Sequence, residues 1–400
     1  MDKKPEKLVP EVRFKGFTDD WEQRKLEEIS KRVRNNDGRM NLPLLTISAR
    51  YGWMTQQSRF SASIAGREKK NYTLLEKHQL SYNHGNSKVA IYGTVYELTN
   101  YDEALVPKVY HSFSLTPENS SKFIESYFHT KKLDAQLRKF IASTARMDGL
   151  LNISFDDFMK VKLFAPEQCE QSKISRIINL IEKLITLQQR KLKQLKQLKT
   201  AMLQQLFVDK NNKQPNLRFK NFKGDWEQQR LKEVAQVTMG QSPSSRNYTN
   251  NPNDYVLVQG NTDLKSNKIS PRIWTKEITK QVRKGEFIMT VRAPVGYLAM
   301  ANMDAVIGRG VAAIDGNKYL YYLLQTKLLD RTWEKLSSGS TFESISSNDI
   351  KNLEIKVTEN EEEKLIAKLM DTVTFLLNLW QSKIEQLTIF KKYLLQKLFI

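Results

Sequence analysis

The sequence is poor in cysteine and has no long apolar run. One cysteine, Cys169, in 400 residues excludes an intrachain disulfide framework and a multi-cysteine zinc site. The longest apolar stretch, residues 365–380, is interrupted by Lys368, Asp371 and Asn378, which argues against a membrane span. Residues 1–8 are rich in lysine and have no apolar centre, so we expect no secretory signal. These features predict a cytoplasmic protein without a membrane partner.

Signatures of several enzyme classes are also missing. There is no GxxxxGK[ST] phosphate loop, which disfavours an ATPase or translocase, and no glycine-rich turn suited to a nucleotide cofactor. The four histidines lack the spacing of metal ligands, so we expect no metal site. We therefore expect neither a catalytic residue nor a cofactor in this chain.

The chain does carry a large excess of positive charge. Lysine and arginine number 64 against 44 aspartates and glutamates, which gives a net charge of +20. A hydrophobic content of 40% is sufficient for folded cores, and 400 residues suggest two to four domains. An excess of this size makes a polyanion, usually nucleic acid, the leading class of partner.

The chain is internally repeated. Residues 10–29 and 215–234 share eleven of twenty positions at an offset of 205, including an Arg-Phe-Lys triplet and an Asp-Trp-Glu-Gln segment. A second match, at an offset of 192, relates residues 153–157 to residues 345–349 and continues through two helical segments with similar ends. The organisation is a similar opening, a divergent middle and a similar helix, present twice.

Each repeat ends in a long amphipathic pattern. Residues 168–208 contain no glycine or proline, and apolar residues recur there at steps of three and four. Residues of the second copy, from Ile366 to Leu398, repeat this spacing. We expect two helices of about 40 residues, roughly 60 Å each, paired antiparallel as a coiled coil. Such helices would hold the two middles at a fixed separation.

The divergent middles, about 30–152 and 235–344, are both net positive and mix short β-branched runs, such as 89–92 and 287–291, with helical stretches. We interpret each as a compact α+β domain. Their loops are rich in cationic, amide and hydroxyl side chains, which meet phosphates and base edges. The candidate DNA-binding residues are Arg39, Arg50, Tyr51, Trp53, Arg67, Lys69, Lys70, Asn71, Tyr72, Arg146, Gln241, Ser242, Ser244, Arg246, Asn247, Tyr248, Gln259, Asn261, Arg292, Arg309, Ser340 and Thr341.

These features together resemble a known family. The repeated Arg-Phe-x-x-Phe-x-x-x-Trp openings and the terminal Leu-x-x-Leu-Phe helices resemble the specificity subunit of type I restriction–modification enzymes. The second copy is the closer match, with Gly-Gln-Ser-Pro at 240–243, Val-Gly at 295–296, Ile-Gly-Arg-Gly at 307–310 and Ser-Ser-Gly-Ser-Thr at 337–341. The first copy has the Pro166, Glu170-Gln171 and Ile174 entry into its helix, whereas Thr358 and Glu362-Glu363 depart from it.

The resemblance implies a fold and a division of labour. It implies two globular target-recognition domains separated by two long antiparallel helices, with an internal pseudo-two-fold repeat. This chain would read a bipartite site on double-stranded DNA, one half per domain. Two methyltransferase subunits would dock on the repeated segments and modify adenine N6, and restriction/translocase subunits would join them. S-adenosylmethionine, ATP and Mg²⁺ would then be bound by the partners.

The same resemblance places the partner-docking candidates on the repeated segments. These candidates are Phe14, Phe17, Trp21, Phe219, Phe222, Trp226, Leu206, Phe207, Leu398 and Phe399. The expected domains are an N-terminal tail (1–9), a first recognition domain with its opening (10–152), a strand and spacer helix (153–208), a linker (209–214), a second recognition domain (215–344) and a second strand and spacer helix (345–400).

Two other functions remain open from the residues alone. The group Asp349, Glu354 and Lys356 superficially resembles a nuclease site, which would make the chain a self-contained DNA enzyme. Apolar residues alternate with Glu354 and Lys356, however, and this alternation predicts a half-buried strand. The other alternative is a coiled-coil protein that binds DNA without sequence preference, through its charge alone.

Overall fold

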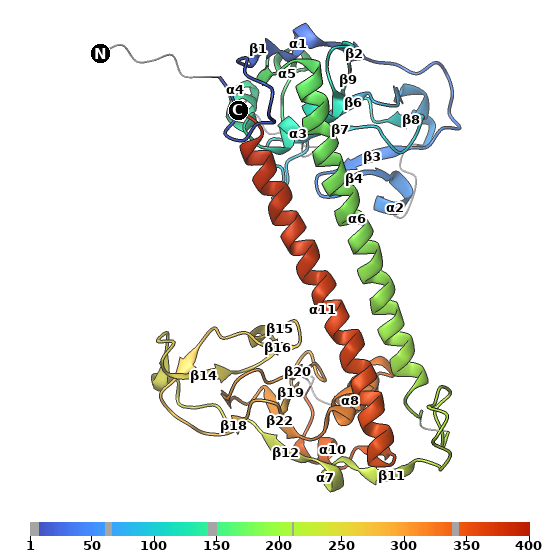
Figure 1. The fold of residues 1–400 in the computed structure, drawn as a ribbon, viewed down its shortest axis with the longest axis vertical. Helices are drawn as coiled ribbons and strands as arrows, with labels where there is room; N and C mark the ends of the chain where they lie inside the picture. Colours follow the sequence, from blue (N-terminus) through green and yellow to red (C-terminus); the bar gives the residue numbers. More distant parts are fainter. Residues whose placement is uncertain (1–7, 61–65, 143–149, 210–211, 338–343) are drawn as a thin grey trace. The chain divides into compact units, whose positions relative to one another are not determined.

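A computed structural model describes residues 8–60, 66–142, 150–209, 212–337 and 344–400, which form two compact units (Figure 1). Unit 1 comprises residues 1–189 and 382–400, and unit 2 comprises residues 190–381. Each unit contains one divergent middle and a part of each of two 38-residue helices, α6 (Gln168–Gln205) and α11 (Asn360–Lys397). The finer domain boundaries drawn from the sequence stay predictions.

The repeated sequence folds into the same frame in both units. In unit 1, β1 (Glu22–Lys25) pairs antiparallel with β10 (Lys162–Ala165); in unit 2, β11 (Glu227–Arg230) pairs with β23 (Glu354–Val357) in the equivalent register. The short helices α1 (Leu26–Ile29) and α7 (Leu231–Val234) follow the first strand of each pair. The second strands follow α5 (Phe155–Met159) and α10 (Ser347–Lys351).

The repeated Ile-Ser-x-x-Asp segments are the starts of α5 and α10. The hydroxyl of Ser154 accepts a hydrogen bond from the Asp157 N–H at 3.0 Å, and Ser346 accepts one from the Asp349 N–H at 3.3 Å. Serine is a preferred N-cap because its oxygen satisfies an amide that has no partner within the helix. Each aspartate in turn accepts a hydrogen bond from its serine hydroxyl. Capping therefore explains why these residues recur.

A buried ion pair ties each opening segment to the first turn of a long helix. Arg13 donates to both oxygens of Glu170 in α6, at 2.9 and 2.8 Å. Arg218 makes the same two-pronged contact with Glu362 in α11, at 2.8 Å to each oxygen. The glutamate side chains are 0% exposed, so each depends on its arginine for charge compensation.

The middle of unit 1 is built on antiparallel strands. Its main sheet has the order β2 (Ser30–Val33), β9 (His111–Leu115), β6 (Leu80–Asn83) and β7 (Thr94–Glu97). Two further pairs are the hairpin β3 (Leu45–Ser48) with β4 (Gly52–Thr55), and β5 (Thr73–Glu76) with β8 (Glu103–Val106). The helices are α2 (Gln56–Phe60), η1 (Gly66–Asn71), α3 (Ser121–His129) and α4 (Asp134–Phe140).

The middle of unit 2 is built on two larger sheets. One has the order β12 (Gln236–Met239), β22 (Val311–Asp315), β19 (Phe287–Thr290), β20 (Leu298–Met300), β16 (Lys268–Ile269) and β15 (Leu264–Lys265). The other has the order β13 (Tyr248–Thr249), β17 (Trp274–Thr275), β14 (Tyr255–Val258), β21 (Ala305–Ile307) and β18 (Gln281–Val282). The turns η2 (Ser245–Asn247) and η3 (Asn261–Asp263) and the helices α8 (Lys318–Leu329) and α9 (Thr332–Ser337) complete it.

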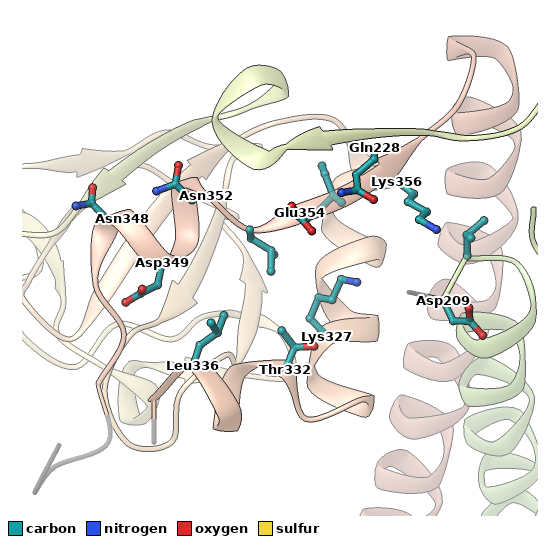
Figure 2. Close-up of a pocket in the computed structure, with 13 residues that line it drawn as sticks. Asp209, Gln228, Lys327, Thr332, Leu336, Asn348, Asp349, Asn352, Glu354 and Lys356 are labelled. Atoms are coloured by element: carbon teal, nitrogen blue, oxygen red, sulfur yellow. The ribbon is translucent and has the colours of Figure 1, made fainter. Parts of the chain in front are cut away.

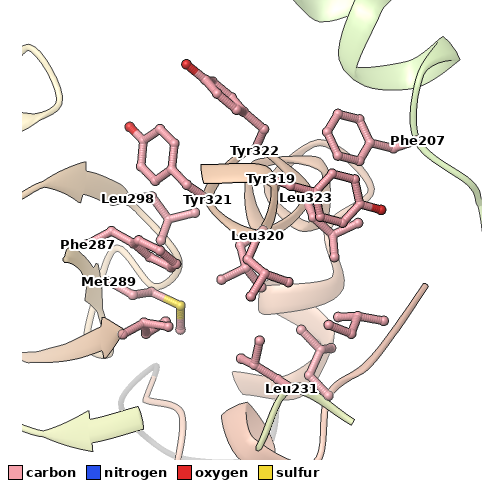
Figure 3. Close-up of a cluster of buried hydrophobic side chains, with 14 of the residues drawn as sticks. Phe207, Leu231, Phe287, Met289, Leu298, Tyr319, Leu320, Tyr321, Tyr322 and Leu323 are labelled. Carbon is pink, nitrogen blue, oxygen red and sulfur yellow. The ribbon is translucent and has the colours of Figure 1, made fainter. Parts of the chain in front are cut away.

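The core of unit 2 joins its middle to the repeated frame and both long helices. Figure 3 shows the part of this core in which Phe287 of the middle, Leu231 of the frame and Phe207 lie around α8. The rings of Phe207, just after α6, and Tyr319 in α8 stack with centroids 5.3 Å apart. Trp226, from the repeated opening, meets the same tyrosine edge-on at 5.8 Å. Ile366 and Met370 of α11 belong to this cluster as well. The divergent middle is therefore held on the frame by apolar burial.

The two long helices pack antiparallel within each unit. In unit 1, Ile174 and Ile178 of α6 share a core with Leu394 and Leu395, near the end of α11. In unit 2 the pairing is reversed, because the end of α6 shares a core with the first turns of α11. The predicted architecture, two α+β domains and two long antiparallel helices, is confirmed. The predicted apolar stripe is not buried throughout: Leu184, Leu187 and Leu198 are 45, 47 and 45% exposed.

One expected strand is absent. The β-branched run at residues 89–92 forms a bend and a turn between β6 and β7. Val89 and Ile91 are 50% and 52% exposed, so neither has a buried face to pack on a sheet. Gly93 follows with a φ of +80°, which suits a turn and not a strand. The other run, at residues 287–291, does form β19.

A charged network joins α3 to both long helices inside unit 1. Lys122 contacts Glu125 at 2.8 Å and Glu182 at 2.5 Å, and Lys391 contacts Glu182 at 2.7 Å. Glu125, His129 and Glu182 also lie close enough together to hold a cation. Both lysines already neutralise the carboxylates, so we interpret the group as an ion-pair network. Burial opposes ionisation of Glu182, but the two lysines outweigh it and lower its pKa.

Replacing Glu182 with glutamine is expected to lower the free energy of unfolding by about 1–2 kcal/mol at pH 7, because Lys391 loses its carboxylate partner. A lowered pKa in the folded state stabilises the fold above the unfolded pKa, near 4.5, and this contribution disappears as the pH falls through the folded value. Urea unfolding from pH 7 to pH 3 should show the two proteins converging. The exposed pair of Glu22 and Arg24 provides a control, since Glu22→Gln should change little.

No helix within the described part of the chain is long and apolar enough to cross a membrane.

Candidate nucleic-acid interface

Three loops of unit 2 meet at one place. They are residues 240–247 after β12, residues 259–263 after β14, and residues 308–310 between β21 and β22. The Gln241 N–H donates to the Ile307 carbonyl at 2.8 Å, and the Gly308 N–H donates to the Val258 carbonyl at 2.8 Å. The Arg309 N–H donates to the hydroxyl of Ser242 at 3.1 Å. These bonds fix the loops against one another.

Glycines allow this close approach. A Cβ atom at Gly240 would lie 2.2 Å from the Gly308 carbonyl oxygen, and one at Gly310 would lie 2.1 Å from the Gln259 carbonyl oxygen. Both distances are shorter than any van der Waals contact, and both involve backbone that cannot rotate away. The Ile-Gly-Arg-Gly and Gly-Gln-Ser-Pro segments thus have a steric explanation.

Some of the polar candidates position the loops. Gln259 donates to the Tyr248 hydroxyl at 2.7 Å. Asn247 donates to Glu277 at 2.7 Å, and the same carboxylate accepts the Ser244 N–H at 2.8 Å. The hydrogen bond from Asn247, followed by that from Ser244, lowers the pKa of Glu277. Glu277 therefore stays ionised and holds the first loop at neutral pH.

The polar groups of other candidates are exposed to solvent. Gln241, Arg246, Asn261, Arg292 and Arg309 are exposed. Arg292 belongs near the cluster because the preceding residue, Val291, donates its N–H to the Gly310 carbonyl at 2.9 Å. Within the described ranges, none of the three arginines has a carboxylate within 4 Å. Three cations without an ion-pair partner, beside amide and hydroxyl groups, are suited to phosphates and base edges. Ser340 and Thr341 lie outside the described residues.

In unit 1, the hairpin of β3 and β4 carries several candidates. Arg50 and Tyr51 occupy its tip, and Tyr51 is 70% exposed. The Arg50 guanidinium lies 5.5 Å from the centre of the Tyr51 ring. Trp53, further along β4, is half-buried and donates its indole N–H to the Glu97 carbonyl at 3.0 Å. The tip thus offers a cation and an aromatic face, while Trp53 anchors the hairpin.

The remaining candidates of unit 1 differ in availability. Tyr72 accepts a hydrogen bond from Gln56 at 3.0 Å, which brings the end of η1 beside the hairpin. In η1, Lys70 and Asn71 are exposed, Lys69 is half-buried, and Arg67 is placed only by its backbone. Arg39 already contacts Glu103 and Asp37 at 2.7–2.8 Å. Its role in the structure is to join its loop to β8. Arg146 lies outside the described residues.

Most of the docking candidates are core residues. Trp21, Trp226, Leu206, Phe207, Leu398 and Phe399 are all less than 5% exposed. The Trp21 ring meets Phe399 edge-on at 6.4 Å, so the end of α11 is anchored in unit 1. Their recurrence is explained by packing, which leaves them no surface for direct contact with a partner. Phe14, Phe17, Phe219 and Phe222 are half-buried.

The residues that hold the loops were not among the sequence candidates. Glu277 fixes the first loop, Asp263 accepts the N–H groups of Gln259 and Gly260, and Thr279 donates to the Gln241 carbonyl at 2.5 Å. Nothing in a single sequence distinguishes these side chains from ordinary surface residues, because each acts through a fold-dependent contact.

The would-be nuclease residues have structural roles as well. Asp349 accepts the hydroxyl and N–H hydrogen bonds of Ser346 as part of the α10 cap. The ammonium of Lys356 donates to the Asn212 carbonyl. Glu354 is exposed and Ile355 is buried, as expected for a half-buried strand. Both anchored side chains therefore serve the frame.

Comparison with known proteins agrees with this architecture. The type I restriction modification DNA specificity domain matches residues 223–388. A Methanocaldococcus jannaschii chain named "Putative type I restriction enzyme MjaX specificity subunit" is 26% identical, over 95% of this chain and 93% of its own length. The MjaIX specificity subunit of the same organism is 28% identical over 43% of this chain and 42% of its own.

Two solved structures share the fold. The type I restriction–modification S subunit from M. genitalium superposes with a TM-score of 0.65, at 13% identity, over 98% of this chain and 99% of its own. A chain from a study of complex assembly and conformational transition in a type I system gives a TM-score of 0.56, at 20% identity, with 98% of each chain covered. Residues 223–388 thus match the type I restriction modification DNA specificity domain, and over nearly its whole length the chain is similar in sequence and in fold to specificity subunits of type I restriction–modification enzymes.

Proposed function

We propose that the chain is the non-catalytic subunit that reads a bipartite site on double-stranded DNA, one half with each unit. The loop cluster of unit 2 carries this proposal, because it presents Arg246, Arg292 and Arg309 on a glycine-fixed backbone. The hairpin tip of unit 1 supplies a different set of groups, Arg50 and Tyr51. Different reading groups on one repeated frame suit two unlike half-sites.

The proposed partners are two methyltransferase subunits that dock on the repeated frame and modify adenine N6. Exposed apolar side chains support a docked partner: Leu180, Leu184 and Leu187 follow one face of α6 and are 45–52% exposed. Restriction/translocase subunits would join this assembly. S-adenosylmethionine, ATP and Mg²⁺ would be bound by the partners, and the long helices would set the unread gap between the half-sites.

Co-expression with the cognate methyltransferase should methylate adenines in a two-part motif with an unread gap. The physical reason is that two separate reading surfaces on one chain contact separate stretches of a duplex. Sequencing that detects methylated adenine in host DNA measures the motif directly. Methylation of a continuous motif, or methylation without sequence preference, would contradict the proposal.

A self-contained nuclease is the second candidate, because Asp349, Glu354 and Lys356 line one pocket. Incubating the purified chain alone with Mg²⁺ and DNA tests it. If the chain cleaves DNA and Glu354→Ala abolishes this cleavage, the nuclease hypothesis is favoured. If the DNA stays intact, the DNA-reading function remains the better explanation. A charge-only DNA binder, the third reading, would lose its DNA equally to specific and unrelated competitors at every salt concentration.

A further inference from the structure

A pocket of about 390 Å³ lies beside β23 in unit 2 (Figure 2). Most of its lining belongs to the repeated frame: residues 353–356 around β23, Asn348 of α10, Asn352 at the end of that helix, and Gln228 of β11. Leu336 of α9 adds an apolar side chain that is 39% exposed. The loops proposed to read DNA contribute nothing to this lining. The pocket is therefore a feature of the frame on which we propose that partners dock.

The pocket exposes one edge of β23. The Leu231 N–H donates to the Leu353 carbonyl, so that carbonyl and the backbone groups of Ile355 and Val357 point toward β11. Hydrogen bonding alternates along an antiparallel strand, so those of Glu354 and Lys356 point the other way. The Lys356 carbonyl accepts the Tyr319 hydroxyl at 2.8 Å. Within the described ranges β11 is the one strand paired with β23, which leaves the Glu354 N–H and carbonyl facing the pocket.

Unit 1 closes the same edge with its own side chains. Lys162 in β10 is the counterpart of Glu354, and both of its backbone groups bond to the amide of Gln136, at 2.9 and 2.7 Å. The Phe164 N–H also contacts the Tyr127 hydroxyl, at 3.4 Å. One repeat thus satisfies its outward strand edge internally, and the other offers a backbone donor and acceptor.

We propose that the pocket takes an extended segment of the methyltransferase subunit, which adds to the edge of β23 as a third strand. The outward N–H and carbonyl of Glu354 are spaced to form two hydrogen bonds with the backbone of a neighbouring strand. Asp349 and Lys356 are engaged within the chain, so neither offers a free charge to the occupant. An apolar side chain of the added strand would cover Leu336. The proposal rests on the proposed docking of two methyltransferase subunits.

The added strand makes the two docking positions unequal. A methyltransferase subunit at unit 2 gains backbone hydrogen bonds, whereas one at unit 1 meets an edge that Gln136 already fills. We therefore expect the purified methyltransferase subunit to bind the full chain in two steps, with the tighter step at unit 2. Hydrogen exchange in the complex should show residues 353–357 gaining protection, while residues 161–165 do not change.

Glu354→Pro removes the outward N–H and blocks strand addition, yet it costs no bond to β11. Native mass spectrometry of the full chain with the methyltransferase subunit should show the tighter step weakened about tenfold or more, since two backbone bonds are lost. The other step should be unchanged. Glu354→Gln keeps the backbone groups and should bind as the parent does. Leu336→Asp, which leaves the strand intact, should weaken the same step.

If the parent, Glu354→Pro and Leu336→Asp give identical titrations, the proposed strand addition at the pocket is wrong, while the docking of two subunits is unaffected. Absence of any methyltransferase binding to the parent would overturn the docking proposal and the pocket together. Self-association of the chain that Glu354→Pro abolishes, without methyltransferase present, would assign the edge to a second copy and overturn the proposed occupant.

Discussion

Gly310→Ala is expected to weaken binding to the half-site read by unit 2 by about 100-fold, a loss equivalent to one or two base contacts. The new Cβ would lie 2.1 Å from the Gln259 carbonyl oxygen, so the second and third loops must separate. Gln259 holds Tyr248, and Arg292 follows a residue bonded to Gly310, so this separation displaces several candidate reading groups at once.

Fluorescence anisotropy with duplexes that vary one half-site at a time measures this effect, using the chain in complex with its methyltransferase. Gly260→Ala is the matched control, because a Cβ there meets nothing within 4 Å and its φ of 178° is ordinary extended backbone. Thermal unfolding distinguishes a shifted loop from a lost fold. If the folded Gly310→Ala protein binds this half-site as tightly as the parent does, the loop cluster is not part of the DNA-reading surface.

The repeated frame was the most predictable part of the fold. Eleven shared positions identified it, and side-chain chemistry explains them: capping serines, paired charges and large aromatic anchors are each required by a local contact. The sequence nevertheless assigned Trp21 and Phe399 to a partner. A buried aromatic anchor and an exposed docking residue recur in the same way in a repeat, and the 6.4 Å contact between these two rings is visible only in the fold.

The candidate interface was predictable in type but not in detail. The loops around Gly240 and Gly308 were recognised by composition, and the structure brings them together. Composition could not separate Arg309, which is exposed, from Arg39, which two carboxylates engage. Glu103 lies 64 residues from Arg39 in the sequence, and no local pattern encodes such a pairing.

Arg218→Leu is expected to lower the free energy of unfolding of unit 2 by roughly 2–3 kcal/mol, because it leaves the Glu362 carboxylate buried without its partner. The value lies below that for a fully buried pair, since Arg218 lines a small surface pocket that admits water. Arg218 also donates to the Gly224 carbonyl at 2.6 Å. Loss of both contacts should free the opening segment from the first turn of α11.

Urea unfolding of the full chain, followed by the fluorescence of its tryptophans, measures the loss. Adding Glu362→Gln to Arg218→Leu should recover part of the stability, because the uncompensated charge is removed; this recovery separates electrostatics from packing. Glu361→Gln is the control at the residue next to Glu362. It breaks an exposed ion pair with Lys364 and should change the stability little. Arg13→Leu should reproduce the effect in unit 1, since Glu170 there is equally buried. If only one of the two substitutions, Arg218→Leu or Arg13→Leu, destabilises the protein, different contacts stabilise the two copies of the repeated frame.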